Sequence, residues 1–192
     1  MGQYYMPVIK RGNVLRRVYS HDFGNGFKLT EHSYVGNNFV NVVANEIVDN
    51  PAQLYWLGDY AEENDFKSPK MFKRIYDYAW TQKTKNRTTI ENPNENFDWN
   101  KDWYFINQTK KEYIKMPKEG DWVYTPISLL TAIGNGRGCG DYRGENSMIG
   151  YWAGNKVYLS ETKPENKYAD ITKDCDFGNE NYNSERRTIF YA

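Results

Sequence analysis

Short β-prone runs separated by turn residues constrain the fold of this 192-residue chain more than any other feature. Residues 3–10 and 14–19 flank Arg11-Gly12-Asn13, a combination that predicts a hairpin with a short glycine-containing loop. Residues 103–107 and 112–116 predict a second hairpin in the same way. We expect a third hairpin around Gly154-Asn155, formed by strands at 148–153 and 156–160. Further strands are expected at 27–31, 53–57, 122–124, 127–131 and 187–191.

Two segments have helical spacing instead. From Asn37 to Asp49, apolar residues recur every three or four positions, and Asn50-Pro51 ends the pattern. The second predicted helix begins at Ser68 as N-cap with Pro69 in the first turn, and its apolar stripe runs to Ala79. Strands in hairpins together with two main helices indicate an α+β fold with a mostly antiparallel sheet.

The length and composition indicate a single domain that spans residues 1–192. Aromatic residues make up 17% of the chain, so we expect an aromatic core whose Tyr and Trp polar groups reach partners near the surface. Residues 83–102 are rich in Lys, Asn, Thr and Glu, and we expect them to form a surface excursion.

Charge and cysteine content exclude several classes of protein. The charges of the 25 basic and 25 acidic side chains cancel, which argues against general electrostatic binding of nucleic acid. A local basic patch is still compatible with this balance. Cys139 and Cys175 with two histidines offer too few ligands for a structural zinc site. No apolar segment is typical of a signal peptide or membrane span, so we expect a cytoplasmic protein without a membrane partner. No cofactor is expected.

Residues 134–144, here called the glycine loop, have the most unusual composition in the chain, with five of its fifteen glycines. Glycines allow successive backbone N–H groups to form an anion-binding nest, for which Arg137 and Arg143 would supply positive charge. Gly138 and Asp141 belong to the same candidate ligand site. The alternative is a bulged connection between strands whose arginines pair with Asp141 and Glu145, because the loop matches no standard phosphate-binding motif.

His32 and Asp59 could complete this site as acid–base groups if the fold brings them to the loop. No nucleophile is marked beside His21 or His32, and ordinary loop and helix-capping roles are the favoured interpretation of both. Asp59, Glu62 and Glu63 could also hold Mg²⁺ or Ca²⁺, but acids exposed to solvent in a connection are the simpler interpretation. The sequence leaves open whether the chain is an enzyme.

One stretch combines basic and aromatic residues and is a candidate partner-binding surface. It could contact single-stranded nucleic acid or a ribonucleoprotein by stacking and charge. Lysines that complement the helix dipole at its C-terminus explain the same composition without a partner. The residues concerned are Lys73, Arg74, Trp80, Lys83, Lys85 and Arg87.

Four motifs together resemble an uncharacterised family of proteins from phages and mobile elements. They are the segments at 1–5 (MGQYY), 31–37 (EHSYVGN), 56–61 (WLGDYA) and 134–142 (GNGRGCGDY). The resemblance implies no activity and no site. It implies a genomic setting in which small proteins commonly block host defence nucleases.

The leading functional hypothesis is therefore a phage-type binding protein that inhibits a host macromolecule, such as a CRISPR-type defence nuclease. Its partner would be a host protein or ribonucleoprotein. The alternative is a small enzyme or ligand-binding domain that acts on a phosphorylated or nucleotide ligand at the glycine loop. The alternative requires 32, 59 and 137–143 to converge on one pocket, whereas the first hypothesis requires an exposed aromatic or charged surface.

Overall fold

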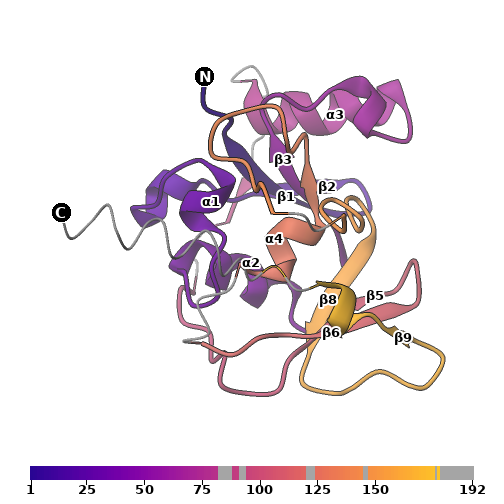
Figure 1. Cartoon of the computed structure of the whole chain (residues 1–192). Helices are drawn as coiled ribbons and strands as arrows, with labels where there is room; N and C mark the ends of the chain where they lie inside the picture. The colour runs from indigo at the N-terminus through magenta and orange to yellow at the C-terminus, as the bar shows by residue number, and fades with distance from the viewer. Residues whose placement is uncertain (82–87, 91–93, 120–123, 145–146, 176, 178–192) are drawn as a thin grey trace.

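The computed structural model describes residues 1–81, 88–90, 94–119, 124–144, 147–175 and 177. In this part of the chain a mixed sheet carries helices on both faces (Figure 1). The strands are β1 (Tyr5–Arg11), β2 (Val14–Arg17), β3 (Ala52–Gly58), β4 (Thr88–Thr89), β5 (Tyr104–Asn107), β6 (Glu112–Lys115), β7 (Ala132–Ile133), β8 (Lys156–Ser160) and β9 (Ala169–Asp170). The helices are α1 (Leu29–His32), α2 (Asn38–Ile47), α3 (Pro69–Trp80) and α4 (Pro126–Leu130), with 3-10 turns η1 (Ser20–Phe23), η2 (Glu63–Asp65) and η3 (Thr172–Cys175).

The strands pair in the order β4-β2-β1-β3-β8-β5-β6-β9, and β7 pairs with β3 outside this path. The pairings β2–β4, β3–β7 and β6–β9 are parallel, and the others are antiparallel. The prediction of an α+β fold with a mostly antiparallel sheet is therefore confirmed. β3 is the central strand, because it pairs with β1 along one edge and with β8 and then β7 along the other.

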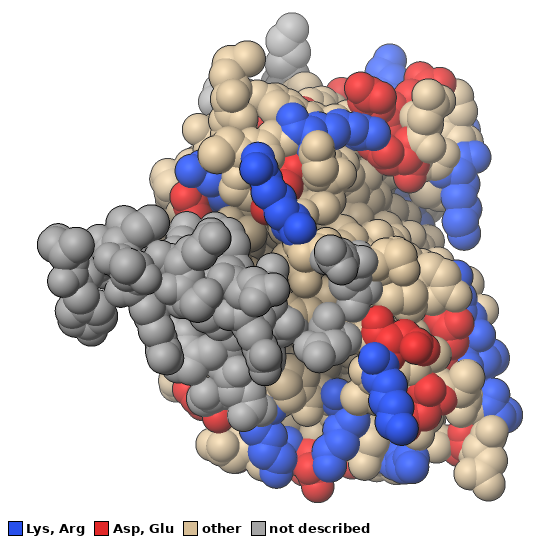
Figure 2. Space-filling view, viewed as in Figure 1, with Lys and Arg blue, Asp and Glu red and all other residues tan. Residues whose placement is uncertain are grey.

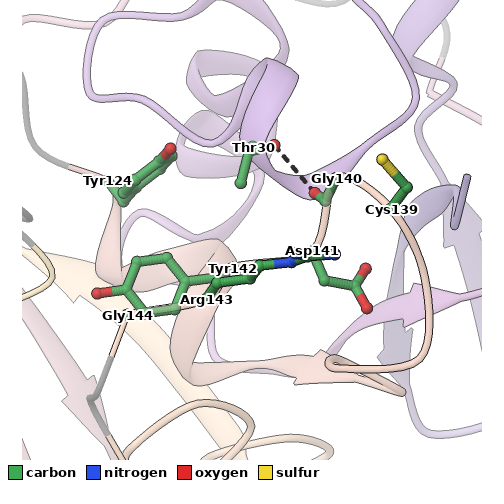
Figure 3. Close-up of a pocket in the computed structure, with 8 residues that line it drawn as sticks. All are labelled: Thr30, Tyr124, Cys139, Gly140, Asp141, Tyr142, Arg143 and Gly144. Atoms are coloured by element: carbon green, nitrogen blue, oxygen red, sulfur yellow. Dashed lines mark hydrogen bonds between the residues drawn. The ribbon is translucent and has the colours of Figure 1, made fainter. Parts of the chain in front are cut away.

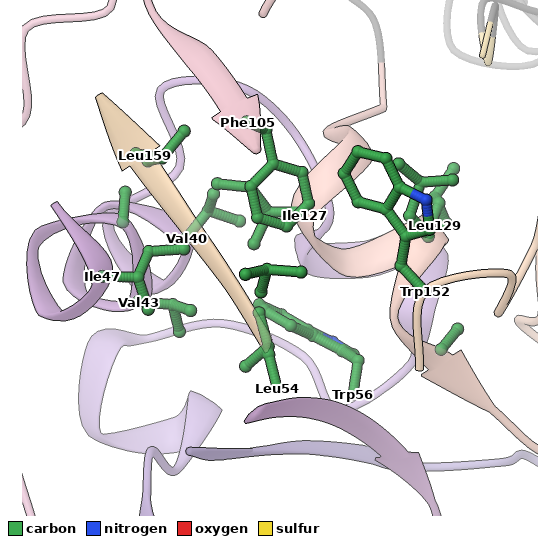
Figure 4. Packing of buried hydrophobic residues seen from close by; sticks show 14 of the residues in the cluster. Val40, Val43, Ile47, Leu54, Trp56, Phe105, Ile127, Leu129, Trp152 and Leu159 are labelled. Atoms are coloured by element: carbon green, nitrogen blue, oxygen red, sulfur yellow. The ribbon is translucent and has the colours of Figure 1, made fainter. Parts of the chain in front are cut away.

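β3 is buried on both faces, which explains its almost continuous apolar sequence. Leu54 and Trp56 point to a large core that includes α2 and α4, whereas Tyr55 and Leu57 point to a smaller core under α3. Figure 4 shows the first core, in which side chains of α2, β3, β5, α4 and β8 interdigitate around Trp56. Consequently the sheet offers little free surface at its centre, and candidate sites lie at its ends.

The two helices expected from the sequence form where the apolar spacing and, for α3, the Ser68 cap predicted them. The Asn37 side chain accepts a hydrogen bond from the Phe39 amide at 2.9 Å and so caps α2. The Ser68 hydroxyl accepts one from the Met71 amide at 3.3 Å and caps α3. Both helices are confirmed, and each turns its apolar stripe toward one of the two cores.

Two segments predicted as strands are helices. The run 127–131 lies mostly in α4, which begins with Thr125 as N-cap and Pro126 in the first turn. This is the same start signal as that of α3, and it prevails over the β-prone apolar residues that follow. The run 27–31 enters the single turn of α1, because Leu29 is buried there and the chain turns back on itself.

The predicted third hairpin is also wrong. Residues 148–153 form turns, because the Gly150 and Trp152 amides donate to the Leu129 and Leu130 carbonyls at 2.9 and 2.7 Å. The end of α4 thereby takes the hydrogen bonds that a partner strand would need. β8 pairs instead with β3 and β5.

Some predictions fall on residues outside the described part. These are the strand at 187–191, most of the run at 122–124 and part of the excursion at 83–102. Within the excursion, Trp99 is fully buried, and its indole N–H donates to the Asn41 side chain of α2 at 2.6 Å. That contact ties the described end of the excursion to the main core.

His32 is part of the core. Its ring is fully buried, with Nδ1 donating to the Gly26 carbonyl and Nε2 accepting the Trp56 indole N–H at 2.9 Å. These two bonds require the neutral imidazole, because a protonated Nε2 cannot accept. Burial lowers the pKa of His32 to about 4, although the bond to Gly26 acts in the opposite direction.

This lowered pKa predicts that the protein loses stability in mild acid. From pH 6.5 down to about 4, the unfolded chain binds a proton at His32 that the folded chain does not, so acid favours unfolding. The free energy of unfolding should fall by up to about 1.4 kcal/mol per pH unit in this window. Urea unfolding across the window measures the slope, and His32→Gln should flatten it.

The matched control is His21→Gln, which removes the chain's other, exposed histidine without touching the Trp56 contact. A His32→Gln protein that keeps the wild-type slope between pH 4 and 6.5 would show that the buried ring is not responsible.

Candidate functional site

The glycine loop contains its own anion. Residue Asp141 is 3% exposed, and its carboxylate Oδ2 accepts the Gly136 and Gly138 amides at 2.7 and 2.9 Å. Its Oδ1 accepts the Tyr5 hydroxyl of β1 at 3.0 Å. The backbone therefore forms a nest of the kind that the glycines suggested, but the carboxylate of the same loop occupies it.

Close packing against the N-terminal segment explains several of the glycines. A Cβ added at Gly138 would lie 2.4 Å from the Gln3 Cβ and 2.8 Å from its backbone N. The loop and the N-terminus also exchange backbone bonds, since the Cys139 carbonyl accepts the Gln3 amide and the Cys139 amide donates to Met1. Gly58, at the end of β3, leaves room for the Gln3 side chain in the same way. Three of the four sequence motifs thus meet at Gln3.

The two arginines of the loop have different surroundings. Arg137 is held by a two-pronged ion pair with Asp65 and donates to the Tyr60 carbonyl at 2.9 Å. The hydrogen bond to Asp65 raises the pKa of the guanidinium above its usual value. Arg143 is exposed, and its side chain makes no ion pair with a described residue. Of the two, only Arg143 therefore lacks a fixed anionic partner among the described residues, which do not include Glu145.

Asp59 lies near Asp141, and it too makes hydrogen bonds that hold the N-terminal segment and α3 in place. Its Oδ1 accepts the Tyr4 amide at 3.0 Å, and its carbonyl accepts the Tyr76 hydroxyl. Burial raises the pKa of Asp59, and the neighbouring Asp141 carboxylate adds to the rise. Burial and the same carboxylate also raise the pKa of Tyr5 strongly.

The cavity at the loop gathers only part of the predicted ligand site. It has a volume of about 210 Å³ and is lined by Thr30, Tyr124 and residues 139–144 (Figure 3). The Asp141 carboxylate points away from the Tyr142 ring in this view, toward the loop that it holds. Asp141 and Arg143 line this cavity, whereas Arg137 lines a different one, of about 310 Å³. His32 and Asp59 line neither.

The described residues of the predicted partner-binding stretch do not form one surface. Lys73 and Arg74 are exposed on α3, where Arg74 donates to the Asn13 carbonyl at 2.8 Å. Trp80, at the end of α3, lines a cavity at the end of the sheet. The remaining members, Lys83, Lys85 and Arg87, lie outside the described residues.

This last cavity, here called the aromatic basin, was not foreseen from the sequence. It has a volume of about 430 Å³ and brings together side chains from four parts of the chain. No sequence spacing connects them, and of the lining residues only Trp80 belongs to the predicted partner-binding stretch. The lining residues are Tyr4, Met6, Arg17, Tyr19, Asp22, Phe27, Ala79, Trp80 and Thr89.

The surface charges give no single-signed patch on the face drawn in Figure 2, where basic and acidic side chains alternate. Within the described residues, no group of three His, Cys, Asp or Glu side chains is placed to hold a metal ion. None of the helices in these same ranges has the length and apolar character that a membrane span requires.

Comparison of the chain with protein-family models, with curated proteins and with solved structures finds no match. The functional interpretation therefore rests on the geometry and on the motif resemblance.

The packing of the loop predicts unequal effects of two glycine substitutions. Gly138→Ala places a methyl group against the Gln3 backbone and should lower the free energy of unfolding by about 3 kcal/mol or more. The control, Gly136→Ala, meets no atom within 4 Å and suffers only from its φ of +95°, for a loss of about 1–2 kcal/mol. Urea unfolding of both variants measures the difference. Equal losses would contradict a packing role for Gly138.

Proposed function

We propose that this chain is a non-enzymatic binding protein that inhibits a macromolecule of a host cell and acts in the cytoplasm. A nuclease of CRISPR-type defence is the first target to test, because the four motifs resemble those of phage and mobile-element proteins. The aromatic basin is the proposed contact surface.

The observation that carries this proposal is the contrast between the basin and the predicted acid–base residues. His32 is fully buried and hydrogen-bonded at both ring nitrogens, and Asp141 holds the glycine loop. These groups are unsuited to bind and release protons of a substrate. The basin instead presents Tyr, Trp and Arg side chains, the residue types that contribute most to binding energy at interfaces.

Tyr4 is the most accessible aromatic side chain of the basin, with 43% of its surface exposed. Its ring contacts Phe27 at a centroid distance of 5.3 Å, so it is exposed yet fixed in place. A fixed aromatic side chain loses little conformational entropy on binding, which favours affinity.

A small-ligand site at the glycine loop is the second candidate. The exposed Arg143, which lines the 210 Å³ cavity, favours it, since a guanidinium with no ion pair among the described residues suits a phosphate or carboxylate group. The occupied nest disfavours it, because the Gly136 and Gly138 amides already donate to Asp141.

Affinity capture followed by activity assays tests the proposed function. The immobilised full-length chain should retain a nuclease or its ribonucleoprotein from a host lysate, and the free chain should slow its cleavage of substrate. Tyr4→Ala should weaken the inhibition about tenfold or more, as expected for an interface hot spot. Tyr151→Ala is the matched control, because Tyr151 is 40% exposed and does not line the basin.

Retention of only a small metabolite, with no nuclease slowed, would refute the inhibitor function. Equal losses in the two tyrosine variants would refute the basin as its contact surface.

A further inference from the structure

The aromatic basin has a composition suited to a flat ligand. Phe27 is its centre, with ring-centroid distances of 5.3 Å to Tyr4, 5.2 Å to Tyr19 and 3.6 Å to His21. Trp80 reaches the same cavity from the end of α3. The basin's volume of about 430 Å³ is in the range of pockets that hold small organic groups.

The basin also contains unused hydrogen-bond donors. The Trp80 indole N–H is shielded from solvent and has no acceptor among the described residues. The Tyr4 and Tyr19 hydroxyls make no hydrogen bond to the described chain either. The Trp80 N–H is too shielded to meet an acceptor placed in the basin, so the two tyrosine hydroxyls are the donors that the basin offers to a ligand.

Charge around the basin is modest. Arg17 is its one basic lining residue and Asp22 its one acid among the described residues, and Arg17 also donates to the Ala79 carbonyl at 2.7 Å. A ligand held here would therefore be bound mainly by stacking, with at most one phosphate near the guanidinium. The balanced charge of the whole chain agrees with this, because broad phosphate binding requires a basic surface.

These features favour one class of ligand over an apolar side chain of a partner protein. An apolar side chain would fill the basin but leave the donors without acceptors. An unpaired nucleobase has a flat face for stacking and ring nitrogen and carbonyl acceptors on its edge, so it satisfies both requirements.

We propose that the aromatic basin binds an unpaired base of single-stranded nucleic acid, stacked on Tyr4 and hydrogen-bonded by the Tyr19 hydroxyl. The inference builds on the proposed function by naming the part of a host nucleoprotein that the basin would bind. In duplex nucleic acid the base is paired and stacked, so a duplex is not a ligand.

Fluorescence anisotropy with labelled oligonucleotides of about ten nucleotides tests this proposal on the full-length chain. The single strand should bind at least about tenfold more tightly than the duplex of the same sequence. Tyr4→Ala should weaken single-strand binding about fivefold or more, the expected loss of one base–aromatic stack, and Tyr151→Ala should leave it unchanged. Because one phosphate contact is expected, the logarithm of the affinity should fall with that of the salt concentration at a slope of about −0.7.

The thermal unfolding midpoint serves as a fold control for both variants, whose tyrosines are 43% and 40% exposed. Equal binding of single strand and duplex, or equal losses in the two variants, would overturn the proposal. A nuclease that is captured and inhibited through Tyr4 while no single strand binds would overturn it too, yet leave the proposed function standing. Single-strand binding without inhibition of any host macromolecule would refute the proposed function and leave the nucleobase site standing.

Discussion

The buried carboxylate of Asp141 is the interaction on which the candidate site depends. One oxygen holds two amides of the glycine loop and the other holds the Tyr5 hydroxyl of β1. A buried carboxylate is costly unless it is fully hydrogen-bonded, and three donors meet that requirement here. The loop, the N-terminal segment and the end of β3 are thereby fixed as one unit, in which Gly58 and Gly138 leave room for Gln3.

This unit changes where function is sought. The residues that most resemble an acid–base site, His32 and Asp59, hold the core and the N-terminal segment together instead. Because β1 is held in place by the Tyr5–Asp141 bond, Tyr4 extends from a fixed strand end into the aromatic basin. The unusual glycine loop and the proposed binding surface are therefore connected through two adjacent residues of the chain, one structural and one exposed.

The sequence predicted the fold where local signals agreed with burial. The apolar spacing after Asn37 and the Ser68 cap correctly placed the two main helices, and the Gly12 turn correctly placed the first hairpin. The strand prediction failed for 127–131, because the Thr125-Pro126 cap outweighed the β-prone residues that follow it. The prediction also failed for 148–153, because amides of this run bond to the end of α4. Contacts between segments that are distant in the sequence could not be predicted either. Nothing in the spacing of Asp141 and Tyr5, or of Tyr4 and Trp80, shows that they meet.

The most direct test of this account is to follow the Gly136 and Gly138 amide resonances by NMR during a titration with inorganic phosphate. Because Asp141 already accepts both hydrogens, the account predicts that neither resonance moves and that both amides stay protected from exchange. A saturable shift of these two resonances would show that an external anion displaces the carboxylate, and would contradict the structural role given to Asp141.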